Sequence, residues 1–280
     1  MSYDVHNHAF VWAEDGNETG NQLIGNLAVL TQSVQAKDFL FPNNEAIFGG
    51  TGQSEFRSAS FWGRNFKAVI KGNIAAGSVN GIGFFFDLQS PLIVGDNESN
   101  GLVFEDNITH SHYRPGASGV AGEIYPEATF GHGLMVTAGL QSKSDHVFKR
   151  LTSYKNYGGA WLEDRVTRLQ DSVIADNGVG VYVLRGVIDG VTIVNGTRNK
   201  LGDAEHPPSS GFGTGVAGSI QVPSSHGGAR APVILDATVV NARGAALVWD
   251  QEPGGQGAVV KKIKIVGGTK RAVFHEDPWY

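Results

Sequence analysis

The hydrophobic and polar positions of this chain repeat a two-part pattern. Each copy has an apolar run that ends in polar residues, then a short turn, a glycine and a second apolar run. The first runs are Leu23–Leu30, Val69–Ser78, Leu102–Ser111, Val147–Asn156, Arg168–Asn177, Val187–Gly196, Val233–Ala242 and Lys261–Gly268. The second runs are Gly81–Leu88, Gly159–Asp164, Gly178–Gly186, Gly244–Gln251 and Arg271–Asp277. A pattern that returns at a step of roughly 20 residues is typical of a solenoid built from short repeats.

The runs are expected to be β-strands. They are short, rich in β-branched and aromatic residues, and alternate, as in Val181, Tyr182 and Val183, whereas the 3.6-residue period of a helix is missing. Asp171 and Gly190, the centres of two runs, are 19 residues apart, which fits one bare coil. The pattern predicts an all-β fold, a right-handed parallel β-helix. A β-sandwich is the alternative, but it uses hairpin turns, and the Asn-Gly pairs of this chain fall between the repeated phrases.

One domain is expected over residues 1–280, because a solenoid has no compact-domain size limit. Strand-like sequence begins within a few residues of Met1 without a recognisable cap, so we interpret the chain as a piece of a longer protein that lacks N-terminal coils. Three stretches interrupt the coil rhythm, and on a β-helix loops of this length form the walls of a groove for a long polymer. These stretches are Gln32–Phe61, Ser111–Gly131 and Asn199–Ser225.

Composition narrows the classes of function. The net charge is −5 and no basic cluster is longer than Lys261-Lys262, which argues against nucleic acid and anionic membranes as partners. The chain has no cysteine, so disulfides and thiolate chemistry are excluded. No apolar run is long enough to span a membrane, and the N-terminus has no signal-peptide pattern.

The first candidate site is the acidic segment EDGNETGN. It places Glu14, Asp15 and Glu18 within a few residues of two asparagine amides and two glycines. Oxygen-rich clusters of this kind suit Ca²⁺, so these three residues are the candidate ligands of a calcium ion. The alternative is a solvated turn between coils, because the spacing of an EF-hand is missing.

The second candidate is the segment HSHYRPG, which follows a strand-like run and opens a long loop. His110, His112 and Tyr113 are candidates for proton transfer, and Arg114 is a candidate for binding a substrate carboxylate through two parallel hydrogen bonds. The alternative is that His110 and His112 share one face of a strand and that one of them only packs.

Acidic residues end the second runs more often than chance predicts. Aligning these runs by their apolar cores puts Asp87, Glu163, Asp164 and Asp250 after the core, with Glu14-Asp15 and Glu276-Asp277 in similar places and Arg185 as an interruption. Equivalent positions stack about 4.8 Å apart in a parallel solenoid, and stacked like charges cost energy. A row of acids therefore indicates a bound cation, an arginine partner or a catalytic task, with Asp87, Glu163 and Asp164 as candidate catalytic residues. The alternative is a solvated edge neutralised by Arg165 and Arg185.

Four tryptophans are candidates for exposed rings that stack on sugars. These are Trp12, Trp62, Trp161 and Trp249. Trp62 and Trp161, with Arg64 and Lys155, are the expected substrate-binding residues beside Arg114. The alternative is that the rings belong to the core, as most aromatic residues at strand positions do.

Taken in order, these segments resemble the cell-migration-inducing and transmembrane hyaluronidase family. The likeness is carried by HAFVWAEDGNETGNQLIGNLAVLTQS, SASFWGRNFKAVIKGNIAAGS with GIGFFF, HSHYRPG, YKNYGGAWL, DSVIADNGVGV and VFHEDP. The resemblance covers nearly the whole chain. It implies a right-handed parallel β-helix of a protein that depolymerises hyaluronan outside the cell with the help of Ca²⁺. The family's N-terminal G8 domain, early coils and cysteines have no counterpart here.

Two hypotheses about function follow. The first is an enzyme that cleaves a hyaluronan-like anionic polysaccharide. As a hydrolase it would use two facing carboxylates from Glu14, Asp15, Glu18, Asp87, Glu163 and Asp164. As a lyase it would neutralise the uronate with Arg114 or Ca²⁺ and remove a proton with His110, His112, Tyr113 or Lys155. The second hypothesis is a non-catalytic β-helix that binds polysaccharide or has a structural role. A weaker third hypothesis is a trimeric adhesin resembling those of phage tails.

Overall fold

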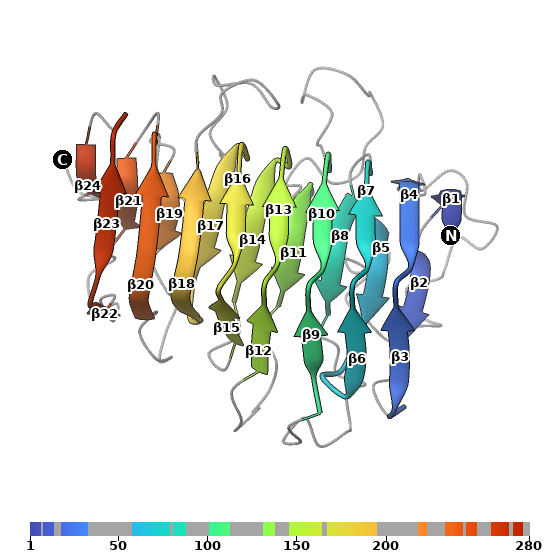
Figure 1. Ribbon diagram of the computed structural model, residues 1–280. Coiled ribbons are helices and arrows are strands. Elements are labelled where there is room, and N and C mark those ends of the chain that lie inside the picture. The colour runs from blue at the N-terminus through green and yellow to red at the C-terminus, as the bar shows by residue number, and fades with distance from the viewer. Residues whose placement is uncertain are drawn as a thin grey trace.

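The computed structural model describes residues 1–6, 8–13, 18–32, 58–78, 81–87, 101–112, 131–137, 146–163, 167–194, 218–222, 233–242, 245–250, 259–268 and 271–276. Every regular element within these ranges is a β-strand, and the strands form two layers (Figure 1). The chain climbs through the front layer, crosses over and descends through the rear layer, and each such turn is one coil of the solenoid.

The front layer, called sheet A, contains fifteen strands among the described residues. They are β1 (Ser2–His6), β3 (Asn21–Ile24), β4 (Leu27–Gln32), β6 (Ala68–Lys71), β7 (Ile74–Ala76), β9 (Val103–Glu105), β10 (Ile108–His110), β12 (His146–Lys149), β13 (Thr152–Tyr154), β15 (Thr167–Gln170), β16 (Val173–Ala175), β18 (Val187–Val194), β20 (Val233–Val240), β22 (Val259–Val260) and β23 (Ile263–Val266).

The rear layer, called sheet B, contains nine strands within the same ranges. They are β2 (His8–Trp12), β5 (Ser58–Gly63), β8 (Gly81–Phe86), β11 (His132–Val136), β14 (Gly158–Leu162), β17 (Val179–Val183), β19 (Gly218–Val222), β21 (Ala245–Asp250) and β24 (Arg271–Glu276).

All the strand pairs of the described chain are parallel, and each strand pairs with the strand one coil away. The predicted first runs share sheet A in register, since Leu23 pairs with Ile70 and Leu169 pairs with Ile188. These findings confirm the prediction of a parallel β-helix and exclude a sandwich built from hairpins. The second runs likewise form sheet B.

In each coil the chain bends at two places in sheet A where a residue has a left-handed backbone conformation. Equivalent bends of successive coils stack into two columns. The first column includes Gly72, Asp106 and Arg150, with φ between 51° and 64°, and it separates the lower from the upper strands of the sheet. Its backbone N–H groups still donate to the next coil, as from Asp106 N to Lys149 O at 3.3 Å. A second column, which includes Ser111 and Lys155, ends the upper strands. Left-handed backbone suits glycine best, so the non-glycine residues here mark places where packing overrides local preference.

The residue after each left-handed position points inward and is often polar. Asn107 Nδ2 donates to Ile70 O at 2.8 Å, and Asn107 Oδ1 accepts from the backbone N–H of Asn73 at 2.9 Å. At the second corner, His112 N–H donates to Asn156 Oδ1, and Asn156 N–H donates to Asn177 Oδ1. These ladders satisfy buried backbone groups where the strands break, and they tie each coil to the next.

The core between the sheets is apolar and rich in aromatic rings. Phe61 and Phe84 stack at 4.8 Å on successive coils, and Phe86 meets Phe148 edge to face at 4.9 Å. All four side chains are fully buried. Stacking of equivalent residues along the axis therefore supplies much of the coil-to-coil contact.

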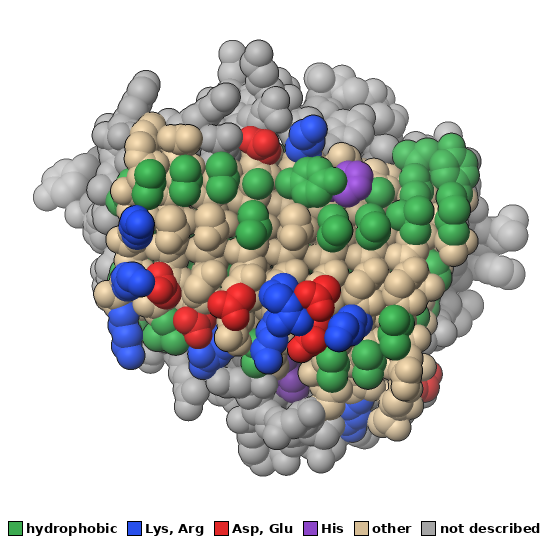
Figure 2. Space-filling view, viewed as in Figure 1, with side chains coloured by type: hydrophobic (Ala, Val, Ile, Leu, Met, Phe, Trp, Pro, Cys, Tyr) green, Lys and Arg blue, Asp and Glu red, His purple; other side chains and the backbone are tan. Residues whose placement is uncertain are grey.

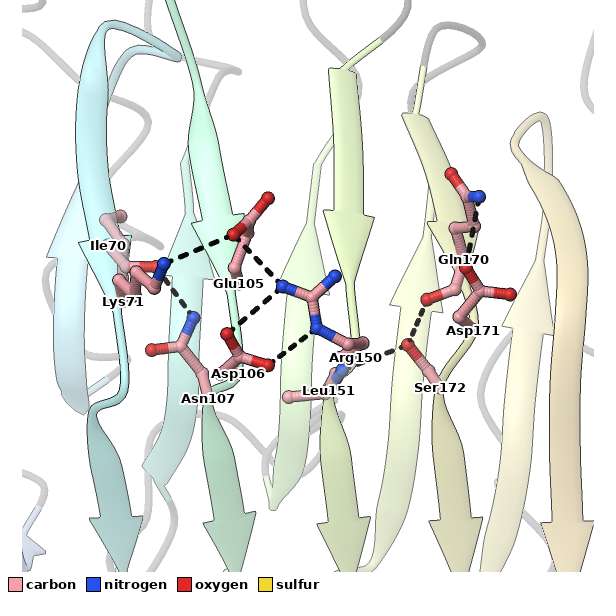
Figure 3. A network of polar contacts seen from close by, with 10 residues as sticks. All are labelled: Ile70, Lys71, Glu105, Asp106, Asn107, Arg150, Leu151, Gln170, Asp171 and Ser172. Atoms are coloured by element: carbon pink, nitrogen blue, oxygen red, sulfur yellow. Dashed lines mark hydrogen bonds and ion pairs between the residues drawn. The ribbon is translucent and has the colours of Figure 1, made fainter.

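The outward face of sheet A is solvated and carries charges in its lower half, where Figure 2 shows acidic and basic side chains alternating. The centre of this band is Arg150, whose Nε donates to Asp106 Oδ1 at 2.6 Å and whose guanidinium also bonds Glu105 at 3.0 Å (Figure 3). Lys71 lies 3.5 Å from the same Glu105 carboxylate. The charges therefore neutralise one another across three coils. No helix in the described ranges has the length and apolarity needed to cross a membrane.

Candidate functional site

The candidate catalytic acids Asp87 and Glu163 lie at equivalent positions of sheet B. Each follows the last residue of its strand, and its backbone N–H donates to the preceding coil, from Asp87 to Gly63 O at 2.9 Å and from Glu163 to Val136 O at 3.0 Å. The row continues from Arg64 through Asp87, Thr137 and Glu163 to Leu184, and we call it the B-edge row. The register of the later strands adds Asp250 and Glu276 to it.

The register corrects two details of the predicted acidic row. Leu184, not Arg185, is equivalent to Glu163, since Leu184 N–H donates to Leu162 O at 2.9 Å. At the N-terminal end Trp12 pairs with Gly63, so Ala13 is equivalent to Arg64 and no acid occupies that position. The row is therefore interrupted by Arg64, Thr137 and Leu184 rather than continuous.

Arg64 is the cationic partner of Asp87. The Arg64 Nε lies 3.8 Å from Asp87 Oδ2, and both side chains are buried, with exposed fractions of 4% and 3%. The guanidinium carbon also lies 4.9 Å from the centre of the Trp62 ring, a cation–π contact. A buried charge is costly unless it is compensated, so the pair and the ring account for two charges lying beneath the surface.

His8, which the sequence did not single out, extends this group. Its imidazole stacks on Trp62 at 4.7 Å with an angle of 3° between the rings, and its Nδ1 accepts from the Ala59 N–H at 3.2 Å. Burial, and secondarily the charge of Arg64, lower the pKa of His8 to about 3. The ring is therefore neutral at physiological pH, and the accepting Nδ1 leaves the proton on Nε2.

A second group of aromatic residues surrounds Glu163. Trp161 Nε1 donates to Glu163 Oε2 at 3.5 Å, and Trp161 packs against Tyr182 at 5.0 Å and His132 at 5.6 Å. Burial, and then Tyr157, raise the pKa of Tyr182, so its hydroxyl stays protonated. His132 and Tyr182 were missed from the sequence. They could have been found by aligning the second runs, because His132 pairs with Gly158 and Tyr182 pairs with Trp161 on the outward face of sheet B.

The prediction of exposed tryptophans is wrong for three of the four. Trp12, Trp62 and Trp161 are at most 5% exposed. Trp12 belongs to the core between the sheets, while Trp62 and Trp161 belong to a second buried cluster on the outward face of sheet B, with Phe85, Met135 and Tyr182 among its members. The physical reason is that sheet B is buried on both faces, as in β8 and β14, where every residue is buried. The side chain of Trp249 lies outside the described residues.

Trp62 retains one feature of a binding residue. Its indole Nε1 is buried and has no hydrogen-bond partner among the described residues. A buried donor that is not satisfied is rare, and each case calls for an explanation. This N–H belongs to the ring that contacts the Arg64 guanidinium.

The two histidines of HSHYRPG do not share a strand face. Ser111 between them has a left-handed φ of 62°, so His110 points out from sheet A while His112 points into the solenoid. His112 is fully buried, and its Nδ1 forms a 2.5 Å hydrogen bond with Ser78 Oγ. Burial, with a smaller effect of His110, lowers its pKa to about 3. His112 is therefore enclosed between the sheets, which argues against its predicted role in proton transfer to a substrate.

His110 and Lys155 lie together, but on sheet A. Burial, and then the charge of Lys155, lower the pKa of His110. Asp87 and Glu163 follow strands of sheet B, so the fold places them on a different sheet from His110 and Lys155. Tyr113, Arg114 and Asp164 lie outside the described residues.

The predicted calcium ligands are described only in part. Glu14 and Asp15 lie outside the described residues, and Glu18 is exposed. The carbonyl oxygen of Glu18 accepts from Asn65 Nδ2 at 2.6 Å, which holds the backbone of Glu18 beside the residue that follows Arg64. No cluster of three His, Cys, Asp or Glu side chains able to hold a metal is present in the described part of the chain.

Comparison with known proteins gives one match, to a β-helix family. The family model described as the CEMIP beta-helix matches residues 1–117. Searches of curated proteins and of solved structures gave no match. The matched segment contains β1 to β10, and therefore Trp62, Arg64 and Asp87. Residues 1–117 are thus similar to the β-helix of the CEMIP family, which confirms for this part of the chain the family resemblance predicted from its sequence.

Proposed function

We propose that this protein cleaves an anionic, hyaluronan-like polysaccharide by hydrolysis at the B-edge row. The observation that carries the proposal is the placement of Asp87 and Glu163 at equivalent positions two coils apart, next to Arg64 and two tryptophans. The match of residues 1–117 to the CEMIP beta-helix supports it.

The spacing of the acids suits an inverting hydrolase. Two coils of a parallel sheet separate equivalent Cα atoms by about 9.6 Å. Carboxyl groups that lean slightly toward each other from these positions would lie within the roughly 6.5–9.5 Å that inverting enzymes keep between theirs, which leaves room for a water molecule. The ion pair with Arg64 suits Asp87 to the role of general base. Asp87 takes a proton from water as the water oxygen bonds to the anomeric carbon. Glu163 gives its proton to the glycosidic oxygen as the bond from that carbon breaks.

Arg64 and Trp62 supply the recognition of an acidic sugar. A guanidinium binds a carboxylate through charge-assisted hydrogen bonds, so the uronate would share Arg64 with Asp87. The buried indole N–H of Trp62 would donate to a sugar oxygen. Since Arg64 and Asp87 are almost fully buried, the proposal requires this edge to open when the polymer binds.

Calcium and an extracellular location complete the proposal. Glu14, Asp15 and Glu18 are the oxygen donors that would hold Ca²⁺. The hydrogen bond from Asn65 to the carbonyl oxygen of Glu18 supports a position near Arg64 for the last of the three. The ion would supply positive charge for the uronate carboxylate. The relation to the CEMIP family supports action outside the cell.

A panel of glycans tests the proposal. The protein is incubated with hyaluronan, chondroitin, a polyuronate and a neutral glucan, and chain length, reducing ends and near-ultraviolet absorbance of the products are measured. We expect shorter chains and new reducing ends from an acidic glycan, without the absorbance of unsaturated sugars. Unsaturated products would show that the reaction is an elimination and not a hydrolysis. Binding without cleavage would show that the protein is a glycan-binding module. A protein that neither binds nor cleaves any of these glycans would overturn the proposal.

A further inference from the structure

The outward face of sheet A carries a row of small and apolar residues with two aromatic rings in its middle. In register along the axis, the row runs Val29, Ala76, His110, Tyr154, Ala175, Val194, Val240 and Val266. Figure 2 shows it as a line of hydrophobic side chains broken by one histidine. The rings lie on neighbouring coils, and the position beyond each ring is an alanine.

The two rings form one stacked unit. His110 and Tyr154 have centroids 4.8 Å apart and an angle of 14° between their planes. His110 Nδ1 and Ser111 Oγ are hydrogen-bonded at 3.1 Å, which holds the imidazole in place. Because Ala76 and Ala175 have only a methyl group, no large side chain of this row covers the outer faces of the rings.

Polar residues neighbour Tyr154 on its own coil and on the next one. Lys155 and Asp176 follow Tyr154 and Ala175 directly and occupy left-handed corner positions on adjacent coils. Thr152 lies two residues before Tyr154 on the same face of β13. Val173, which holds the corresponding place beside Ala175, is 43% exposed. The register thus brings residues that carry an ammonium, a carboxylate, a hydroxyl and an exposed apolar side chain into the neighbourhood of Tyr154.

We propose that His110 and Tyr154 form a binding subsite for a pyranose ring of a glycan chain, which stacks on Tyr154 above Ala175. A pyranose has an apolar face of C–H groups that suits an aromatic ring, and hydroxyls at its rim that can bond both Lys155 and Asp176. The mixed charge of this rim complements a hydroxyl-rich ligand better than a ligand of one charge. The row also runs along the solenoid axis, which suits an extended polymer.

This subsite does not depend on the proposed hydrolysis, because it lies on sheet A while Asp87 and Glu163 follow strands of sheet B. Its ring pair is also uncharged at neutral pH, since burial and Lys155 lower the pKa of His110. The subsite would hold the polymer at a second place on the molecule.

The test compares substitutions at two positions of the same row. Binding of hyaluronan oligosaccharides and of a neutral β-glucan oligosaccharide is measured by titration calorimetry for the full chain, Tyr154→Ala, Tyr154→Phe and Val194→Ala. We expect Tyr154→Ala to weaken binding about 3- to 10-fold, the usual worth of one aromatic stacking contact, while Tyr154→Phe and Val194→Ala stay within about twofold. Thermal melting of each variant identifies one that fails to fold.

Equal affinities of Tyr154→Ala and Val194→Ala, or a wild-type chain that binds none of the oligosaccharides, would overturn the subsite. If the chain cleaves hyaluronan and Tyr154→Ala binds normally, only the subsite fails. If binding depends on Tyr154 but no glycan is cleaved, only the proposed hydrolysis fails.

Discussion

Replacing Asn107 by alanine tests whether the inward asparagine ladder holds neighbouring coils together. The Asn107 side chain accepts from the Asn73 N–H at 2.9 Å and from Asn73 Nδ2 at 3.1 Å, and it donates to Ile70 O at 2.8 Å. The substitution removes all three bonds at a fully buried position. A buried polar group left without its bond costs about 1–3 kcal/mol, so we expect a loss of about 2–4 kcal/mol in the free energy of unfolding.

Asn26→Ala is the matched control, because Asn26 belongs to the same column but is only half-buried. Within the described residues its side chain makes one bond, from Nδ2 to Asn73 Oδ1 at 3.1 Å, which is worth about 1 kcal/mol. Urea unfolding followed by tryptophan fluorescence measures both variants, and thermal melting should place Asn107→Ala roughly 5–10 °C below wild type. Equal losses for the two variants would refute the reasoning that buried ladder bonds dominate.

Three further predictions concern pH, packing and calcium. Burial lowers the pKa of His112 to about 3 from 6.5, so below pH 6.5 the unfolded chain binds a proton that the folded chain does not. The free energy of unfolding should therefore decrease as the pH is lowered below 6.5, by up to about 1.4 kcal/mol per pH unit. Urea unfolding at about pH 6.5 and about pH 4.5 should show a smaller fall for His112→Asn, and an unchanged fall would contradict this. Gly83→Ala places a Cβ 2.1 Å from Thr109 Oγ1 and 2.5 Å from the Gly133 carbonyl oxygen. It should cost roughly 1–3 kcal/mol or more, and a melting temperature equal to wild type would show that the coils can separate. Chelation of Ca²⁺ should reduce hyaluronan depolymerisation and added Ca²⁺ should restore it, because the candidate ligands are oxygen-rich; activity that is indifferent to chelator would remove the ion from the proposal.

The sequence predicted the coil register well because a solenoid repeats the same physical problem in every coil. Inward positions such as Leu169 and Ile188 must be apolar and lie in register. The spacing of such apolar residues along the sequence therefore gives the length of a coil. The same logic aligned Asp87 with Glu163, which the backbone hydrogen bonds of sheet B confirm.

The environments of individual side chains were harder to predict. A strand buried on both faces shows no alternation, and GIGFFF in β8 and GGAWL in β14 carry that signal, which would have identified Trp161 as buried. The opposite directions of His110 and His112 depend on the left-handed backbone of Ser111, a conformation that serine seldom adopts and that its identity does not reveal. The ion pair of Arg64 with Asp87 joins residues 23 positions apart, at a distance of 3.8 Å. It became visible only once the register was known.

The most direct test of the central claim is the rate of hyaluronan depolymerisation by Asp87→Asn and Glu163→Gln. Asp189→Asn is the control, since Asp189 is an acid of sheet A that pairs with Arg168 at 3.1 Å. If the two acids act as base and acid, the folded fraction of each of the first two variants should lose about 100-fold or more in kcat/KM, while Asp189→Asn keeps its activity. Asp87→Asn should also melt at a lower temperature, because it removes the carboxylate that compensates the buried charge of Arg64, so its activity is measured well below its melting temperature. Depolymerisation by Asp87→Asn and Glu163→Gln at the rate of the control would contradict the assignment of the reaction to the B-edge row.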